Sequence, residues 1–390
     1  MEPQTGSGSA MKYVVWLIVL ALVVWGVVSY SGKGETAPVK ETGPIKIGVL
    51  LPMTGDAASY GEPARNVYQL AVEEINKAGG VDGRSLELIV EDSKCNGKDA
   101  TNAAQKLINV DKVAIVLGGF CSGESIAATP VAEAAKVALF SAGSSSPDLT
   151  AISQYFFRNY PSDASQGKVL AEAAYTTKGW KKVALLQEQT DYSLGVYKAF
   201  SETFEGLGGT IVKEEAASSV TDFRTQLTKL KAAKADALFI DTQTPAVSER
   251  ILKQLQDLNW KPALIFNDVT GGAPETLGAY KALVEGAISA EFTADPSNAK
   301  FAKLTADYKA KYGAELPFQS YGQTEYDAVY MIRDGILAVG NNGEKFAAWG
   351  RSVKDWDGAS GKVTIGANGD RIGGHTLEVI KNGKAERYQQ

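Results

Sequence analysis

Short apolar runs alternate with longer amphipathic stretches along most of the chain. Branched and aromatic side chains fill the runs, and polar residues, glycine or proline bound them, which is typical of buried strands. The runs predicted as strands are 45–51, 86–90, 113–117, 137–140, 183–187, 237–240 and 263–266. Strands that are apolar throughout and separated by helices indicate parallel sheets covered on both faces. The pattern therefore predicts an α/β fold.

Two of the intervening stretches illustrate the predicted helices. In "EPARNVYQLAVEEINKAGG" (62–80), Pro63 suits the opening turn and two glycines end the helix. Its apolar residues recur at helical spacing, at Val67, Leu70, Ala71, Ile75 and Ala78. In "DFRTQLTKLKAAKAD" (222–236), Asp222 can cap the first turn before a stripe of Phe223, Leu227 and Leu230. Each helix should pack one apolar face on a sheet.

Length and charge narrow the class of protein. A chain of 390 residues with 44% hydrophobic residues is long enough to divide into two lobes. The 40 basic and 45 acidic residues leave a net charge of −5 without a long basic run, so nucleic acid is not expected as a partner. The only histidine, His375, excludes histidine-rich metal sites, and its position beside two glycines predicts a turn or surface residue. No metal or cofactor is predicted.

The N-terminal region predicts a membrane anchor. Residues 13–30 include no charge and carry aromatic residues near both ends, as a membrane-spanning helix requires. No small-residue cleavage site or lipid-accepting cysteine follows, so the anchor is expected to stay uncleaved, between a short cytoplasmic segment (1–12) and a linker (31–43). The globular part then lies outside the cytoplasm at the cell membrane. Cys95 and Cys121 can form a disulfide there or remain free thiols.

The stretch "VLGGFCSGESIAATPVAEAAK" (116–136) leads from a strand through glycines, a cysteine and hydroxyls into a helix. It matches neither the P-loop spacing nor the dinucleotide-binding spacing. A nucleophile elbow requires G-x-S-x-G, but "GFCSG" places Ser122 one residue late, and the single histidine is distant in sequence. The sequence therefore predicts no enzyme.

This turn does have the features of an anion site. Its glycines allow close approach, Ser122 offers a hydroxyl, and a helix opening near Glu124 directs free amides towards a carboxylate. A similar turn, "LFSAGSSSPDLT", follows the next strand and carries Ser144, Ser145 and Ser146. Neighbouring parallel strands end at one edge of a sheet, so the two turns outline one pocket. Alternatively, these serines only cap turns and helices.

The order and spacing of these motifs resemble a known family. Quoted in sequence order, they are "IKIGVLLPMTGDAASYGEPARNVYQLAVEEINKAGG", "GGFCSGESIAATPVAEAAKVALFSAGSSSPDLT", "QTDYSLG" and "TDFRTQLTKLKAAKADALFID". They resemble the substrate-binding component of branched-chain amino acid ABC transporters, the leucine/isoleucine/valine-binding family of type I periplasmic binding proteins. The resemblance extends from Ile45 almost to the end of the chain. It implies two doubly wound, Rossmann-like lobes joined by a three-crossover hinge, with a permease and an ATPase as partners.

Breaks in the pattern near 156–167 and 288–298 predict where the chain passes between the lobes, and the resemblance implies the residues of a site. Lobe 1 would be 44–160 with 291–345, and lobe 2 would be 161–290 with 346–390. The ligand carboxylate would be bound by Ser122, Ser144 and Ser145. Aromatic contacts would come from Tyr60 in the first lobe and Tyr192 in the second.

At the other end of the ligand, the resemblance assigns Asp268 to the ammonium group, although an aspartate in "NDVTGG" can also be a plain turn residue. A zwitterion inside a closed cleft needs donors at one pole and an anion at the other, which fits these residues. Gln243 stands where relatives have an aromatic residue and predicts a more polar pocket. The family's disulfide would join Cys95 and Cys121.

The predicted function is capture of an amino acid and its delivery to a permease. A second hypothesis is a sensor or regulator of the same fold that binds an amide or a small organic acid. The sequence leaves the identity of the ligand open between them.

Overall fold

The computed structural model describes residues 8–31 and 42–389, which belong to two compact units. The first unit contains the helix α1 (Gly8–Ser31). Within the described residues, no helix combines the length and the apolar character needed to cross a membrane. The anchor predicted over 13–30 is therefore not confirmed. Most of the predicted segments 1–12 and 31–43 falls outside the described residues.

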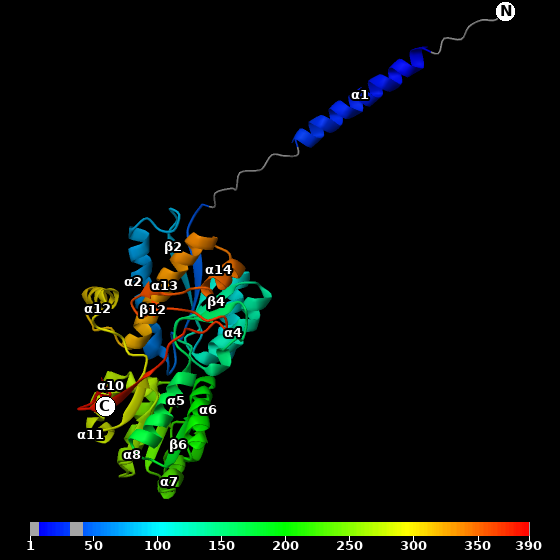
Figure 1. Ribbon diagram of the computed structural model, residues 1–390. Coiled ribbons are helices and arrows are strands. Elements are labelled where there is room, and N and C mark those ends of the chain that lie inside the picture. Colours follow the sequence, from blue (N-terminus) through cyan, green and yellow to red (C-terminus); the bar gives the residue numbers. More distant parts are fainter. Residues whose placement is uncertain (1–7, 32–41, 390) are drawn as a thin grey trace, which may run out of the picture. The chain divides into compact units, whose positions relative to one another are not determined.

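The second unit begins with a five-stranded parallel sheet in the order β2-β1-β3-β4-β5, shown in blue to green in Figure 1. Its strands are β1 (Ile45–Leu51), β2 (Leu86–Asp92), β3 (Ile115–Leu117), β4 (Ala138–Ser141) and β5 (Phe156–Arg158). The helical segments between them are α2 (Ala58–Lys77), α3 (Gly97–Asn109), α4 (Ser122–Ala134) and the short η1 (Pro147–Leu149). This sheet is the centre of lobe 1.

A seven-stranded sheet in the order β14-β13-β10-β9-β8-β6-β7 forms the centre of lobe 2. Its strands are β6 (Lys182–Glu188), β7 (Thr210–Ala216), β8 (Ala237–Asp241), β9 (Ala263–Phe266), β10 (Ile288–Glu291), β13 (Thr376–Lys381) and β14 (Lys384–Arg387). Its helical segments are α5 (Asp163–Glu172), η2 (Ala173–Thr177), α6 (Asp191–Gly206), α7 (Arg224–Ala232), α8 (Pro245–Asp257), α9 (Asp268–Gly271), α10 (Pro274–Ala279) and α11 (Lys281–Val284). Only β13 and β14 add antiparallel pairs.

Both sheets bury their two faces, as the apolar runs predict. Val49 of β1 packs in the core that includes α2, and its neighbour Leu50 packs in the core with α3 and α4. In lobe 2, Leu186 faces the core with α7 and α8, whereas Leu185 faces the core with α5 and α6. Side chains alternate between faces along a strand, so a strand buried on both faces is apolar at every position.

The chain crosses between the lobes three times, after β5, after β10 and before β13. After the second crossing it forms α12 (Ala299–Tyr312), α13 (Gln319–Val339), α14 (Gly343–Gly350) and the strand pair β11 (Trp356–Gly358) and β12 (Gly361–Val363). Phe346, Val363 and Ile365 belong to the core of lobe 1. The structure therefore places 346–365 with lobe 1, whereas the sequence analysis assigned everything after 345 to lobe 2.

The structure contains all seven predicted strands and corrects the start of the first predicted helix. α2 begins at Ala58, so Pro63 lies inside the helix and not in its opening turn. A Cβ atom on Gly61 would lie 2.2 Å from the carbonyl oxygen of Pro52. Glycine therefore lets the early turns of α2 approach the end of β1, which places Tyr60 beside the sheet edge.

Glu325 of α13 is a buried acid that makes stability depend on pH. Burial raises the pKa of its carboxyl group to about 8. The folded state therefore keeps a proton that the unfolded state releases near the ordinary glutamate value. The free energy of unfolding should fall as pH rises from about 5 to about 8.

We expect Glu325→Gln to remove this part of the pH dependence, on the order of a few kcal/mol, because the amide does not ionise. Urea unfolding at a series of pH values measures the effect, with Glu133→Gln at an exposed position as the control. The prediction would be contradicted if the free energy of unfolding changed with pH by the same amount in the wild type and in Glu325→Gln.

Candidate ligand-binding site

A pocket lies between the lobes, at the carboxyl ends of strands from both sheets. The cavity inside it is small, about 20 Å³, which is room for about one water molecule, so an amino acid enters only when the lobes separate or side chains move. Its lining residues are Tyr60, Phe120, Cys121, Ser122, Gly143, Ser145, Tyr192, Gln243, Val269 and Tyr321. Five predicted site residues, Tyr60, Ser122, Ser145, Tyr192 and Gln243, are thus brought together.

Ser122 gives the pocket a hydrogen-bond donor. It is buried at the first position of α4. Its Oγ accepts bonds from the backbone N–H groups of Ser145 and Ser146, at 3.4 and 3.1 Å. With two donors already on the oxygen, the hydroxyl proton remains available to a ligand. The amide of Glu124 bonds to the carbonyl oxygen of Cys121, which leaves the first two amides of α4 as donors, so this end of the pocket suits a carboxylate.

Glu124 lies in the first turn of α4, as the sequence predicted, and its side chain folds back to hold the start of the helix in place. It accepts bonds from the backbone N–H groups of Cys121 and Cys95, at 2.8 and 2.7 Å. Burial raises the pKa of Glu124 to about 7, although its hydrogen bonds act in the opposite direction. The predicted disulfide between Cys95 and Cys121 is present. The disulfide and Glu124 together fix the turn that carries Ser122.

Ser144 does not line the pocket. Its hydroxyl lies 2.7 Å from the carbonyl oxygen of Gly119 and 2.7 Å from the hydroxyl of Ser125. It also approaches the carbonyl oxygens of Phe120 and Cys121. The side chain therefore joins the two serine-bearing turns to each other, which is the capping role left open by the sequence analysis.

Asp268, the predicted partner of the ligand ammonium group, does not line the pocket. It is buried beside the pocket, where three phenols bind its carboxylate. Tyr160 and Tyr321 donate to its Oδ2 at 2.9 and 3.0 Å, and Tyr192 donates to its Oδ1. Burial raises the pKa of all three tyrosines well above the ordinary value, so they remain protonated donors. Asp268 is buried behind Tyr192 and Tyr321, and its neighbour Val269 reaches the pocket surface.

Aromatic rings form the remaining wall of the pocket. Tyr60 stacks on Phe120 with ring centroids 4.9 Å apart, and Tyr321 lies 5.0 Å from Phe120. Neither Phe120 nor Tyr321 was predicted from the sequence. Phe120 precedes Cys121 in the glycine turn, where its position was a usable signal, but Tyr321 comes from α13 and carries no local motif. The wall offers an apolar surface beside the polar groups.

His375 is buried, contrary to the expectation of a turn or surface residue. It lies immediately before β13, where the chain returns to lobe 2. Its ring is 6.0 Å from the ring of Tyr160. Tertiary packing at the third crossing therefore covers a residue whose glycine neighbours indicated exposure.

An ion pair joins the lobes at the rim of the cleft. Arg250 of α8 binds Asp56, which precedes α2, through two hydrogen bonds of 2.8 and 2.9 Å. The arginine bond lowers the pKa of Asp56. A second pair, Lys198 with Asp148, also connects the lobes but has a separation of 4.0 Å. Only the first pair has the two-pronged geometry that makes arginine–carboxylate contacts effective.

Comparisons with known proteins agree with this arrangement. The family model of the periplasmic binding proteins matches residues 44–382. The Leu/Ile/Val-binding protein BraC3 of Rhizobium johnstonii is 28% identical over 330 residues, 84% of this chain and 88% of that protein. A leucine-, isoleucine-, valine-, threonine- and alanine-binding protein of Pseudomonas aeruginosa is 28% identical over 355 residues, 90% of this chain and 91% of that protein.

Solved structures show the same two-lobed fold. The leucine-binding protein LivK of Thermotoga maritima has a TM-score of 0.81 and 30% identity, covering 88% of this chain and 98% of that one. LivJ of Streptococcus pneumoniae, solved with isoleucine, has a TM-score of 0.79 and 27% identity, covering 88% of this chain and 98% of that one. A solute-binding protein of Rhodopseudomonas palustris, solved with 3,4-dihydroxybenzoic acid, has a TM-score of 0.77 and 23% identity, covering 89% and 96%.

The ion pair at the rim predicts how closure can be weakened. Asp56→Asn should lower the population of closed molecules, because a partly exposed pair contributes about 0.2–1 kcal/mol and acts only when the lobes meet. Small-angle X-ray scattering would detect this as a larger radius of gyration. Asp148→Asn, in the longer interlobe pair, is the matched control. Equal scattering from Asp56→Asn and the wild type would contradict the prediction.

Proposed function

The chain belongs to the periplasmic binding protein family, and from this premise we propose that its cleft captures an amino acid for an ABC transporter. It is a binding protein and not an enzyme. The proposed ligand is a branched-chain or more polar amino acid, held as a zwitterion between the lobes. A permease and an ATPase would receive the ligand. The moving bodies would be the two lobes, connected by the three crossings.

The proposal rests on one observation: the pocket has hydrogen-bond donors at one end and a buried carboxylate beside it. Ser122, Ser145 and the start of α4 present donors. On the other side, the buried Asp268 is surrounded by phenols. An amino acid requires both, because desolvating its two charges is tolerable only when each is paired. We infer that its ammonium group takes the place of a phenol beside Asp268.

The side-chain end of the ligand would meet Tyr60 and Phe120, which supply apolar surface. Gln243 also lines the pocket, and its backbone N–H donates to Glu188 at 2.8 Å. The amide of Gln243 therefore favours a ligand with a polar group over a purely aliphatic one. This supports tests with threonine and alanine beside leucine, isoleucine and valine.

Ser122→Ala and Asp268→Asn should each weaken amino acid binding by about 1.5–3 kcal/mol, roughly ten- to 150-fold in Kd. Each variant removes a hydrogen bond or charge that pairs with one pole of the ligand. Isothermal titration of the full chain with the five amino acids measures the effect. Ser201→Ala is the control, because that hydroxyl donates to the carbonyl oxygen of Lys198 in its own helix, away from the pocket lining.

Unchanged affinity in both variants would remove the site assignment. The same variants test the sensor hypothesis, in which the ligand is a small organic acid or an amide. A carboxylic acid without an ammonium group would depend on Ser122 and not on Asp268. A loss of affinity in Ser122→Ala, without a loss in Asp268→Asn, would therefore favour a small organic acid as the ligand.

We infer further that residues 13–30 tether the protein to the cell membrane with its lobes outside the cytoplasm. In support, this segment has no charged residue, and the apolar side chains of α1 between Tyr13 and Trp25 are exposed. The full chain should stay with membranes after a carbonate wash, and a chain begun at Lys40 should be released. Release of both chains would contradict the tether.

A further inference from the structure

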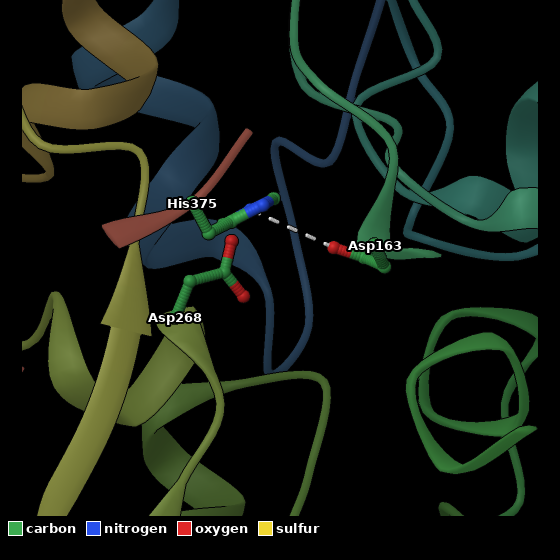
Figure 2. Close-up of side chains that lie close together, drawn as sticks. All are labelled: Asp163, Asp268 and His375. Atoms are coloured by element: carbon green, nitrogen blue, oxygen red, sulfur yellow. Dashed lines mark ion pairs between the residues drawn. The ribbon is translucent and has the colours of Figure 1, made fainter. Parts of the chain in front are cut away.

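A cluster of three buried side chains lies beside the proposed ligand site. Asp163 begins α5, Asp268 begins α9 and His375 precedes β13. Figure 2 shows the three side chains pointing towards one another from separate segments. One ligand atom from each lies within 4.8 Å of the other two, and all three residues are buried. No metal site was predicted from the sequence, because His375 is its only histidine.

Two members of the cluster have polar atoms without a protein partner. Both carboxylate oxygens of Asp163 and Nε2 of His375 are buried and form no hydrogen bond in the described part of the chain. Nε2 and Oδ1 of Asp163 are 3.9 Å apart, which is too long for a hydrogen bond. Whichever tautomer the ring adopts, both groups remain unsatisfied. Buried polar groups of this kind indicate a missing partner.

The other side of the imidazole ring is fixed. Nδ1 of His375 lies 2.7 Å from the hydroxyl of Ser165, which donates to the carbonyl oxygen of Ser162 at 3.0 Å. When this hydroxyl donates to Ser162, Nδ1 carries the ring proton and Nε2 keeps a lone pair. Metal-bound histidines are typically oriented in this way by a hydrogen bond at the second nitrogen.

The buried carboxyl groups in and around the cluster also favour the binding of a cation. Asp163 and Asp268 provide two carboxyl groups, and Oδ2 of the nearby Asp241 is another buried oxygen that has no partner among the described residues. Arg158 is the neighbouring cation, but it binds Asp370 at 2.8 Å and the carbonyl oxygens of two serines. Its guanidinium group is therefore already committed elsewhere.

We propose that Asp163, Asp268 and His375 bind a divalent transition-metal ion. One imidazole nitrogen with carboxylate oxygens suits Zn²⁺ or Mn²⁺, whereas Ca²⁺ and Mg²⁺ prefer oxygen ligands alone. Bonds of about 2.0–2.2 Å from one ion can span the 3.9 Å between Nε2 and Oδ1. Oδ1 of Asp268 accepts a single phenol bond, from Tyr192, and retains a position for the ion.

The site has a consequence for ligand binding. The proposed function assigns Asp268 to the ligand ammonium group, and the metal uses the same carboxylate. The ion and the amino acid therefore compete. This competition rests on the proposed function, but the metal site itself does not.

The single histidine makes the metal site directly observable. The untagged full chain, labelled with ¹⁵N-histidine and stripped of metal, contains one imidazole ring. Adding one equivalent of Zn²⁺ should shift the Nε2 resonance and leave Nδ1 protonated. An unchanged Nε2 resonance would overturn the proposal without requiring any variant.

Variants then test the ligand set. Asp163→Asn and His375→Gln should each weaken Zn²⁺ binding at least tenfold in isothermal titration, the range expected when a site loses a ligand or its support. Asp307→Asn, at an exposed aspartate paired with Lys303, is the matched control. Saturating Zn²⁺ should weaken leucine binding at least tenfold in the wild type, whereas His375→Gln should give one leucine affinity with and without Zn²⁺.

The outcomes separate the two proposals. Equal Zn²⁺ affinity in His375→Gln and the wild type would overturn the metal site and leave the proposed function intact. A wild type that binds Zn²⁺ but none of the five amino acids would contradict the proposed ligand and leave the metal site intact. Weaker leucine binding in Asp163→Asn without any Zn²⁺ binding would assign the cluster to an organic cation and overturn the metal site.

Discussion

The arrangement of the cleft depends on the three phenols that bind Asp268. Tyr160 comes from the first crossing between the lobes, Tyr192 from α6 in lobe 2 and Tyr321 from α13 in lobe 1. A buried carboxylate is very unfavourable unless donors surround it, so this aspartate holds parts of both lobes around one point. A ligand with an ammonium group can replace one of the phenols as a donor to Asp268, and the ligand would then connect the two lobes.

Hydrophobic patterning was sufficient to predict the central strands, because a strand buried on both faces is apolar at each position. The strands that sequence reasoning missed are short or mixed in character. β5 has three residues, and β7 carries lysine and two glutamates on a partly exposed edge. The start of α2 was missed because Pro63 suggested an opening turn, while the close approach of Gly61 to Pro52 is visible only in three dimensions.

The residues of the site were likewise predictable only where a local sequence pattern marked their place in the fold. Ser122, Ser145, Tyr60 and Tyr192 follow strands or open helices, where sequence position indicates location in the fold, and the structure brings them to one pocket. Tyr321 reaches that pocket from α13, and Asp163 meets His375 only because the chain crosses the hinge repeatedly. Contacts between distant segments leave no periodic signal, so neither could be found by reasoning from local pattern.

The disulfide lies next to the turn that carries Ser122, in the wall of the proposed ligand site. Cys95 and Cys121 are joined, and the backbone amides of both also bind Glu124. If the disulfide were reduced, Glu124 would still connect the loop before α3 to the start of α4 through these two hydrogen bonds. The turn that carries Ser122 therefore has two independent supports, one covalent and one made of hydrogen bonds.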